Sequence, residues 1–273
     1  MKTRNYRISV GPALDLDIGE TGAVDGRPVI LIHGLSDSWS SYLPLMAEMP
    51  DDMRLIAVSL RGHGNSAKPA QGYRLADMAR DVLAVMDALG LARADVVGHS
   101  LGSTVAQKLV ELVPGRVASL TLIGAFIRMG TDPAVISFRD DAIVPLTDPV
   151  DPGFVREFQE GAVGPDTPRK IIERAVAESM KLTASDWKAA MDAAVAADLT
   201  HALDGFTGPV LVLHGQLDGF CLAAEQAELA LGEGRRLISQ AHWGHSPHWE
   251  HPAETASMLA RLIGEEAATQ PAA

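Results

Sequence analysis

Hydrophobic residues occur along this chain in short uninterrupted runs, separated by longer amphipathic stretches. The runs are rich in Val, Ile and Leu and occupy residues 29–32, 55–58, 95–97, 120–123 and 210–213. Runs this short, without polar alternation, are typical of parallel strands buried on both faces. Stretches with helical periodicity occupy residues 76–89, 101–113, 221–231 and 252–263. The alternation predicts an α/β protein with a mostly parallel sheet and helices on both faces.

The two ends of this pattern carry further strands. Alternating apolar and polar residues at 6–10 and 13–18 predict an antiparallel hairpin at the edge of the sheet. Residues 235–252 are expected to supply a last strand and the loop that follows it.

The alternation stops between residues 127 and 207, where no strand is evident. We expect Pro-rich loops there, followed by two helices. The first starts at "DTPRK", with Asp166 or Thr167 as N-cap and Pro168 near the first helical position, and the second starts near Ser185. A helical insert between parallel strands predicts a cap over their carboxyl ends. The predicted division is a core of residues 1–126 and 208–273 with a cap of residues 127–207.

Composition narrows the class of protein. The chain has 273 residues, 47% of them hydrophobic, enough for one large domain or a domain with an insertion. A net charge of −12 argues against nucleic-acid and anionic-membrane partners. The single cysteine, Cys221, excludes an intramolecular disulfide and any multi-cysteine metal site. With no signal-peptide pattern or long apolar span, we expect a cytoplasmic protein that acts on a small molecule, and oligomeric state stays open.

The stretch "ADVVGHSLGSTVAQ" places one hydroxyl between two glycines at the end of an apolar run. Gly98 to Gly102 match G-x-S-x-G, with a predicted strand before and a helix after, which is the context that motif requires. We interpret Ser100 as a nucleophile on a sharp strand-to-helix turn, and the N–H of Leu101 as an oxyanion donor. The alternative is a small residue in a tight turn.

A serine nucleophile needs a base and an orienting carboxylate, expected in loops after later strands. Asp218 follows the apolar run in "PVLVLHGQLDGF", whereas the loop after "LTLIGAFIRM" has no acid near its start. Asp198 and Asp204 are assigned to helix ends. The stretch "HGLSDSW" supplies the N–H of Leu35 as second oxyanion donor, and there His33 is expected to brace the loop.

The base is expected in "ISQAHWGHSPHWEHP", where His242, His245, His248 and His251 recur at every third residue. Because a loop that contains proline gives this spacing no common face, we disfavour a metal site. His245 follows Gly244 and precedes the last helix, so we choose it as the base.

With these residues placed, the chain resembles α/β-hydrolase-fold enzymes over nearly its whole length. The segments "LIHGLSDSW", "LRGHGNS", "VVGHSLGS", "LVLHGQLD" and "GHSPHWEHP" occur in that family's order. The resemblance implies an eight-stranded type of sheet with a helical cap, a triad of Ser100, Asp218 and His245, and no metal or organic cofactor. Two positions depart from the family: Ser59 stands where Asp is common, and Ser103 where Gly is common. We expect Ser59 to alter loop bracing, and Ser103 to narrow the approach to the nucleophile or add a hydrogen bond there.

Single residues separate the sister activities. A serine at position 100 argues against haloalkane dehalogenases and epoxide hydrolases, which use aspartate there. Epoxide hydrolases also need tyrosines in the cap, and all three tyrosines of this chain come before the predicted cap. "IHGLSDSW" and "LRGHGNS" resemble enol-lactonases and esterases, so we favour ester or lactone hydrolysis. Trp249-Glu250-His251 resembles C–C hydrolases of dienoic diketones, although Ser246 stands where those enzymes carry Trp, and Leu101 where they tend toward Met. A binding protein that keeps the triad but hardly turns over is the third reading.

Cap and cap-proximal residues are expected to set specificity through an apolar pocket. The candidates, each also consistent with core packing, are Phe126, Ile127, Met129, Phe154, Met180 and Trp187. Arg128 is a candidate for a substrate carboxylate, with a solvated loop charge as its alternative.

Overall fold

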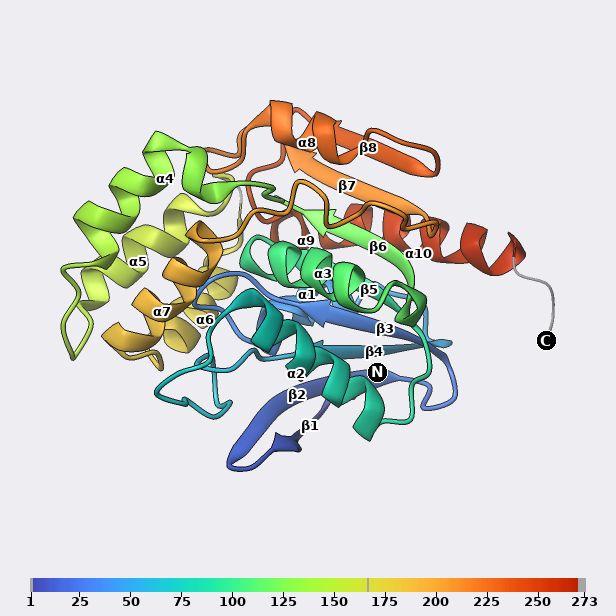
Figure 1. Ribbon diagram of the computed structural model, residues 1–273, viewed down its shortest axis with the longest axis horizontal. Helices are drawn as coiled ribbons and strands as arrows, with labels where there is room; N and C mark the ends of the chain where they lie inside the picture. The colour runs from blue at the N-terminus through green and yellow to red at the C-terminus, as the bar shows by residue number, and fades with distance from the viewer. Residues whose placement is uncertain (1, 166, 270–273) are drawn as a thin grey trace.

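An eight-stranded sheet runs through the computed structural model, which describes residues 2–165 and 167–269 (Figure 1). Its strands are β1 (Arg4–Gly11), β2 (Leu14–Gly22), β3 (Arg27–Ile32), β4 (Met53–Val58), β5 (Ala94–His99), β6 (Val117–Ile123), β7 (Val210–Gly215) and β8 (Arg235–Gln240). Their order is β1-β2-β4-β3-β5-β6-β7-β8. Strand β2 pairs antiparallel with β1 and β4, and every later pairing is parallel. The predicted fold class and edge hairpin are confirmed.

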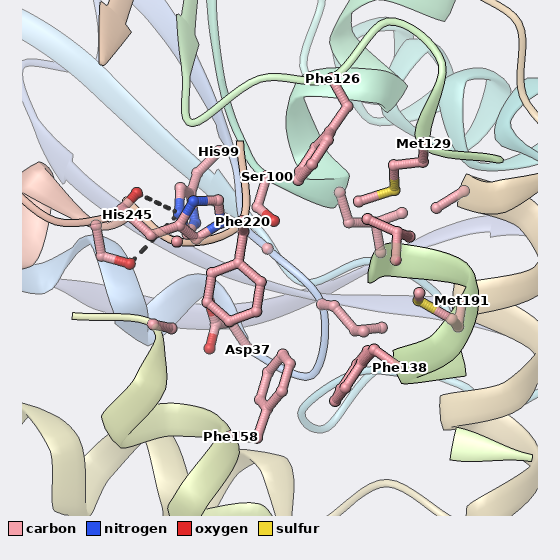
Figure 2. A pocket seen from close by; sticks show the side chains of 18 of the residues that line it. Asp37, His99, Ser100, Phe126, Met129, Phe138, Phe158, Met191, Phe220 and His245 are labelled. Carbon is pink, nitrogen blue, oxygen red and sulfur yellow. Dashed lines mark hydrogen bonds between the residues drawn. The ribbon is translucent and has the colours of Figure 1, made fainter. Parts of the chain in front are cut away.

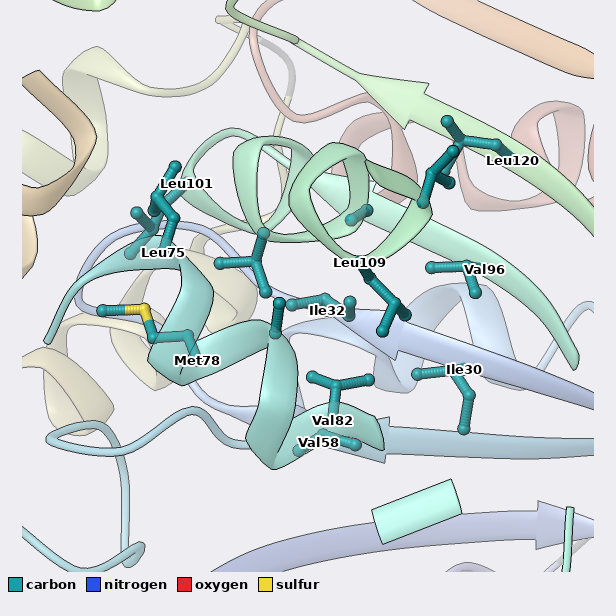
Figure 3. Close-up of a cluster of buried hydrophobic side chains, with 14 of the residues drawn as sticks. Ile30, Ile32, Val58, Leu75, Met78, Val82, Val96, Leu101, Leu109 and Leu120 are labelled. Atoms are coloured by element: carbon teal, nitrogen blue, oxygen red, sulfur yellow. The ribbon is translucent and has the colours of Figure 1, made fainter. Parts of the chain in front are cut away.

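Alternate side chains of the parallel strands enter two separate cores. On one face, Ile30, Ile32 and Val96 pack against helices α2 (Leu75–Ala88) and α3 (Leu101–Leu112), as Figure 3 shows. Helix α8 (Ala223–Leu229) lies against β7 and β8 and adds Leu229 to this core. On the other face, Val29 and Leu31 pack with helices α1 (Leu43–Met46) and α10 (Pro252–Thr269). Burial on both faces explains why these strands read as continuous hydrophobic runs.

The helices between β6 and β7 gather at one end of the sheet, on the left of Figure 1. They are α4 (Pro133–Phe138), α5 (Pro152–Gly161), α6 (Arg169–Ser179) and α7 (Ala184–Val195), with a short 3₁₀ turn at Met129–Thr131 and a π-helical turn at Arg139–Ile143. They bury a hydrophobic cluster of their own around Trp187. The division at residues 127 and 207 stays a prediction.

Our expectation of loops in the first half of this insert is wrong. Helix α4 is capped by Asp132 and α5 by Asp151, and in each case the next residue is proline. An acidic N-cap followed by proline is a helix-start signal, because proline fixes a helical φ where its missing N–H costs nothing. The two Asp-Pro pairs therefore carried the information that was overlooked.

The second half of the insert is closer to the prediction. The N-cap of α6 is Pro168 rather than Thr167, because the helix begins at Arg169; the other predicted cap, Asp166, lies outside the described residues. Helix α7 begins at Ala184, with Thr183 and Asp186 forming a reciprocal capping box. Across the described part of the chain, no helix is both long and apolar enough to cross a membrane.

Candidate active site

Ser100 occupies a strained turn between β5 and α3. Its φ of 51° and ψ of −118° lie outside the regions that residues with a Cβ ordinarily adopt. The Ser100 N–H donates to the carbonyl oxygen of Ile123 on β6 at 3.0 Å, which ties the turn to the sheet. The backbone N–H of Leu101 begins α3, where it has no intrahelical acceptor. The turn thus places the Ser100 hydroxyl beside the amide donor that starts α3.

Close backbone packing explains the small residues around this turn. A Cβ at Gly102 would lie 2.1 Å from the carbonyl oxygen of Ile32 on β3. A Cβ at Gly34, in the loop after β3, would lie 3.2 Å from the Cβ of Ser100. Only glycine lets these two segments come so close to the serine turn. The loop that carries Leu35 is therefore packed directly against Ser100.

Asp218 and His245 are joined by a buried hydrogen bond. The Nδ1–H of His245 donates to Asp218 Oδ2 at 2.7 Å, and the other carboxylate oxygen accepts from the N–H groups of Phe220 and Cys221. Burial alone would raise the pKa of Asp218, but His245 and the two amide donors outweigh it and hold that pKa below its usual value. An ionised Asp218 fixes the His245 tautomer, leaving Nε2 as the acceptor.

The loop around His245 is held by its neighbours. Glu250 accepts from the N–H groups of Gly244 at 2.7 Å and Ser246 at 2.9 Å, and His99 Nε2 lies 3.1 Å from the His245 carbonyl oxygen. These contacts hold the backbone at His245 and at both of its neighbours in the chain.

The remaining histidines of this stretch point to different places. His248 is buried between Tyr42 and His99, and neither of its ring nitrogens has a partner among the described residues. His242 and His251 lie together beside Glu254 at the surface. The described side chains offer two groupings with metal-ligand geometry, that one and Asp218 with Cys221 and His245. In the second, the His245 and Asp218 atoms already bond to each other.

A cavity of about 210 Å³ lies between the sheet edge and the cap (Figure 2). Ser100 and His245 both line it, together with Leu35 and Leu101. Aromatic and aliphatic side chains form most of the rest, including Phe138, Phe158, Met191 and Phe220. Its acidic lining residues are Asp37 and Asp132, and no Lys or Arg is among the described residues that line it. The nucleophile candidate and its candidate base thus open onto one apolar space.

Three comparisons with known proteins agree with the fold. The family model for the alpha/beta hydrolase fold matches residues 27–149. A non-heme haloperoxidase of Rhodococcus erythropolis is 30% identical over 227 residues, which cover 76% of this chain and 80% of that protein. The chain belongs to the α/β-hydrolase fold family.

Other similarities are narrower. The acetyltransferase component of an acetoin cleaving system from Pseudomonas putida is 39% identical over 106 residues, which are 39% of this α/β hydrolase and only 29% of that protein. The structure of a thermophilic esterase from Thermogutta terrifontis superposes with a TM-score of 0.85 over 96% of this chain and 99% of the esterase. At 23% identity, that likeness shows the fold.

The cavity of this α/β hydrolase differs from the predicted pocket at four positions. Phe126 and Met129 line it. Ile127 instead packs into the sheet core, Phe154 and Trp187 pack inside the cap, and Met180 is 37% exposed at the end of α6. Sequence reasoning missed Phe138, Phe158 and Met191, whose helices were either overlooked or not oriented, and Phe220, which directly follows the Asp218 turn.

The residues that depart from the family pattern have structural roles. Ser59 Oγ accepts from the N–H of Trp39 at 3.0 Å, which braces two loops as expected. The side chain of Ser103 neither lines the cavity nor adds a hydrogen bond near the nucleophile: it is fully buried in α3, and its Oγ has no partner in the described part of the chain. His33 accepts from the N–H of Leu60 at 3.0 Å and holds the loop that follows β3. Arg128 pairs with Glu228 at 2.7 Å and lies outside the cavity lining.

Proposed function

We propose that this α/β hydrolase cleaves a small carboxylic ester or lactone through a covalent acyl-serine intermediate. The observation that carries the proposal is that Ser100, on its strained turn, and His245, hydrogen-bonded to Asp218, line one apolar cavity. A strained serine with a free hydroxyl beside an oriented imidazole is the arrangement that acyl transfer requires.

In the proposed reaction, His245 Nε2 takes the hydroxyl proton of Ser100 as Ser100 Oγ attacks the carbonyl carbon of the substrate. The carbonyl oxygen becomes an oxyanion, which the N–H groups of Leu35 and Leu101 stabilise. The imidazolium, stabilised by Asp218, then gives its proton to the leaving alcohol as the acyl bond breaks. Water then attacks the acyl carbonyl carbon and gives a proton to His245, and His245 returns that proton to the Ser100 oxygen as the acyl–oxygen bond breaks and the acid leaves.

The cavity lining supports an uncharged, largely apolar acyl group. The described lining has two carboxylic side chains and no Lys or Arg, so an anionic substrate finds no opposite charge there. This argues against the alternative of dienoic C–C substrates, which bring a carboxylate. The volume of the cavity, about 210 Å³, suits a small substrate.

Active-site labelling tests the proposal. A fluorophosphonate probe should label the wild type and leave Ser100→Ala unlabelled, and the same variant should lose all measurable hydrolysis in a panel of p-nitrophenyl esters, lactones and vinylogous diketones. Stoichiometric product release without further turnover would favour a binding protein instead. Hydrolysis by Ser100→Ala at the wild-type rate would show that Ser100 is not the nucleophile.

A further inference from the structure

Asp37 is a buried acid that the proposed mechanism does not use. It lies two residues after Leu35, following Ser36, whose φ of 65° turns the chain inward. The Asp37 residue is 3% exposed and lines the cavity (Figure 2). An acid placed among Phe158, Phe220 and other apolar groups calls for a polar partner.

One oxygen of this acid has such a partner in the cap. Gln159 on α5, itself 1% exposed, places its Nε2 3.2 Å from Asp37 Oδ1. The same amide nitrogen lies 2.8 Å from Ser179 Oγ and 3.1 Å from Ser36 Oγ. Gln159 is thus held by hydroxyl groups from both the cap and the loop, and it fixes the orientation of the Asp37 carboxyl group.

The second oxygen, Asp37 Oδ2, has no side-chain hydrogen-bond partner among the described residues, although the backbone N–H of Gly34 also donates to the carboxyl group. Burial raises the pKa of Asp37 well above its usual value, with a smaller contribution from the nearby Glu178 carboxylate, and the Gln159 amide and the Gly34 N–H only partly offset it. The described lining of the cavity contains no Lys or Arg to stabilise a carboxylate. The raised pKa favours the protonated form of Asp37, and in that form Oδ1 accepts from Gln159 while Oδ2 carries the proton.

From this geometry we propose that Asp37 is a substrate-binding residue that donates a hydrogen bond from Oδ2 to a second carbonyl oxygen of the substrate. This inference rests on the proposed ester or lactone hydrolysis and narrows its substrate class. The oxyanion donors serve the scissile carbonyl, whereas Asp37 lines the same cavity, and its carboxyl group has no hydrogen-bond acceptor among the described side chains. A substrate whose acyl chain carries a keto or amide oxygen supplies that acceptor, and a plain alkyl chain leaves the donor unpaired.

Two pairs of esters, each differing by one keto oxygen, test the inference. The first pair is p-nitrophenyl pentanoate and p-nitrophenyl 4-oxopentanoate. The second is p-nitrophenyl hexanoate and p-nitrophenyl 5-oxohexanoate, in which the keto oxygen lies one carbon further from the ester. The readout is the ratio of kcat/KM for the oxo ester to that for its alkyl parent, corrected for their rates of alkaline hydrolysis. We expect at least one oxo position to be favoured about tenfold in the wild type, the ordinary effect of one hydrogen bond.

Two substitutions at position 37 separate hydrogen bonding from charge. Asp37→Leu, close in size and without a donor, should bring the ratio to about 1. Asp37→Asn keeps a donor toward the cavity and an oxygen toward Gln159, so it should retain most of the preference. Asp132→Asn is the matched control: it changes the other lining acid, which caps α4, and should leave the ratio unchanged.

The outcomes distinguish this inference from the proposed function. An unchanged ratio in Asp37→Leu, with hydrolysis still dependent on Ser100, would overturn the role of Asp37 alone. Loss of the preference in Asp37→Asn would overturn it too, since it would mean that an ionised carboxylate matters. If circular dichroism shows that Asp37→Leu does not fold, the role of Asp37 is decided by Asp37→Asn and Gln159→Leu. The Gln159→Leu variant removes the hydrogen bond that orients the Asp37 carboxyl group and should lower the ratio.

Discussion

The two sides of the cavity are built by different means. On the sheet side, hydrogen bonds hold the residues around the candidate base: Asp218 accepts two amide hydrogen bonds, and Glu250 accepts two from the loop of His245. On the cap side, apolar side chains of α4, α5 and α7 are held mainly by packing around Trp187. Hydrogen bonds specify positions to a fraction of an ångström, whereas packing tolerates volume-conserving change. If Ser100 acts as proposed, this difference predicts that changes on the sheet side alter the chemistry and that changes on the cap side alter substrate preference.

The largest effect is expected from the sheet side, in Asp218→Asn. The asparagine still accepts from the N–H groups of Phe220 and Cys221, but it presents an N–H to His245 and imposes the wrong tautomer. We expect kcat to fall by about 10⁴-fold, the size of loss that this change causes in serine proteases, with little change in thermal stability.

The chain contains a matched control for that measurement. Asp204 bonds to His201 at 2.9 Å in an exposed His–Asp pair far from the cavity lining. Asp204→Asn should leave kcat unchanged. A loss of less than tenfold in Asp218→Asn would mean that the buried carboxylate does not orient the base.

On the cap side, Trp187→Ala should act through packing. Trp187 is fully buried and its ring lies 5.4 Å from that of Phe154 and 5.1 Å from that of Phe158, which lines the cavity. Removing it should cost about 3–5 kcal/mol of stability and raise KM. Denaturant unfolding and ester kinetics measure both.

Trp187→Ala should leave the reactivity of Ser100 unchanged. Because Ser100 is fixed by the sheet and by α3, its fluorophosphonate labelling rate should stay close to that of the wild type. Equal losses of labelling and of substrate affinity would show that the two sides do not act separately.

The sequence was more informative about the sheet side, and the reason is physical. Continuous apolar runs have few structural alternatives, and the Gly98–Gly102 motif works only in a strand-to-helix turn, so short local signals predicted Ser100 and the parallel sheet. The hydrogen bond between Asp218 and His245 followed from the order of the strands. These are properties of single segments or of chain topology.

The cap depends on contacts between helices, which no single segment encodes. Phe154 and Trp187 occupy a cluster inside the cap while Phe158, four residues after Phe154, reaches the cavity. Helical periodicity identifies an apolar face, but it does not say whether that face meets a neighbouring helix or an empty space. The overlooked Asp-Pro caps were readable, and the assignment of lining residues was not.

Acid should destabilise the protein through the sheet side. Burial lowers the pKa of His248 to about 3 and that of His63 to about 4, whereas both take up protons near pH 6.5 when unfolded. Below pH 6.5 the unfolded chain thus binds more protons, and stability falls as pH drops toward 4, by about 1.4 kcal/mol per pH unit for each histidine.

Urea unfolding at pH 6.5, 5.5 and 4.5 checks this slope. His248→Gln should make it shallower by about one proton. Helices α4, α5, α6 and α7 contain no histidine, so Trp187→Ala should lower stability at every pH without changing the slope. A His248→Gln slope equal to that of the wild type would assign the acid sensitivity to other groups.

The smallest effects are expected from two buried serines, and they should have opposite signs. Ser103 Oγ in α3 has no partner among the described residues, so Ser103→Ala removes an unsatisfied polar group and adds a better helix former. We expect a gain of about 1 kcal/mol in the free energy of unfolding.

Ser179 Oγ donates to the Ala175 carbonyl oxygen at 2.8 Å and accepts from Gln159. Ser179→Ala should lose about 1 kcal/mol, and calorimetry of both variants measures the difference. If Asp37 acts as proposed, Ser179→Ala should also weaken the preference for oxo esters and Ser103→Ala should not, because of these two serines only Ser179 contacts the Gln159 amide that orients the acid.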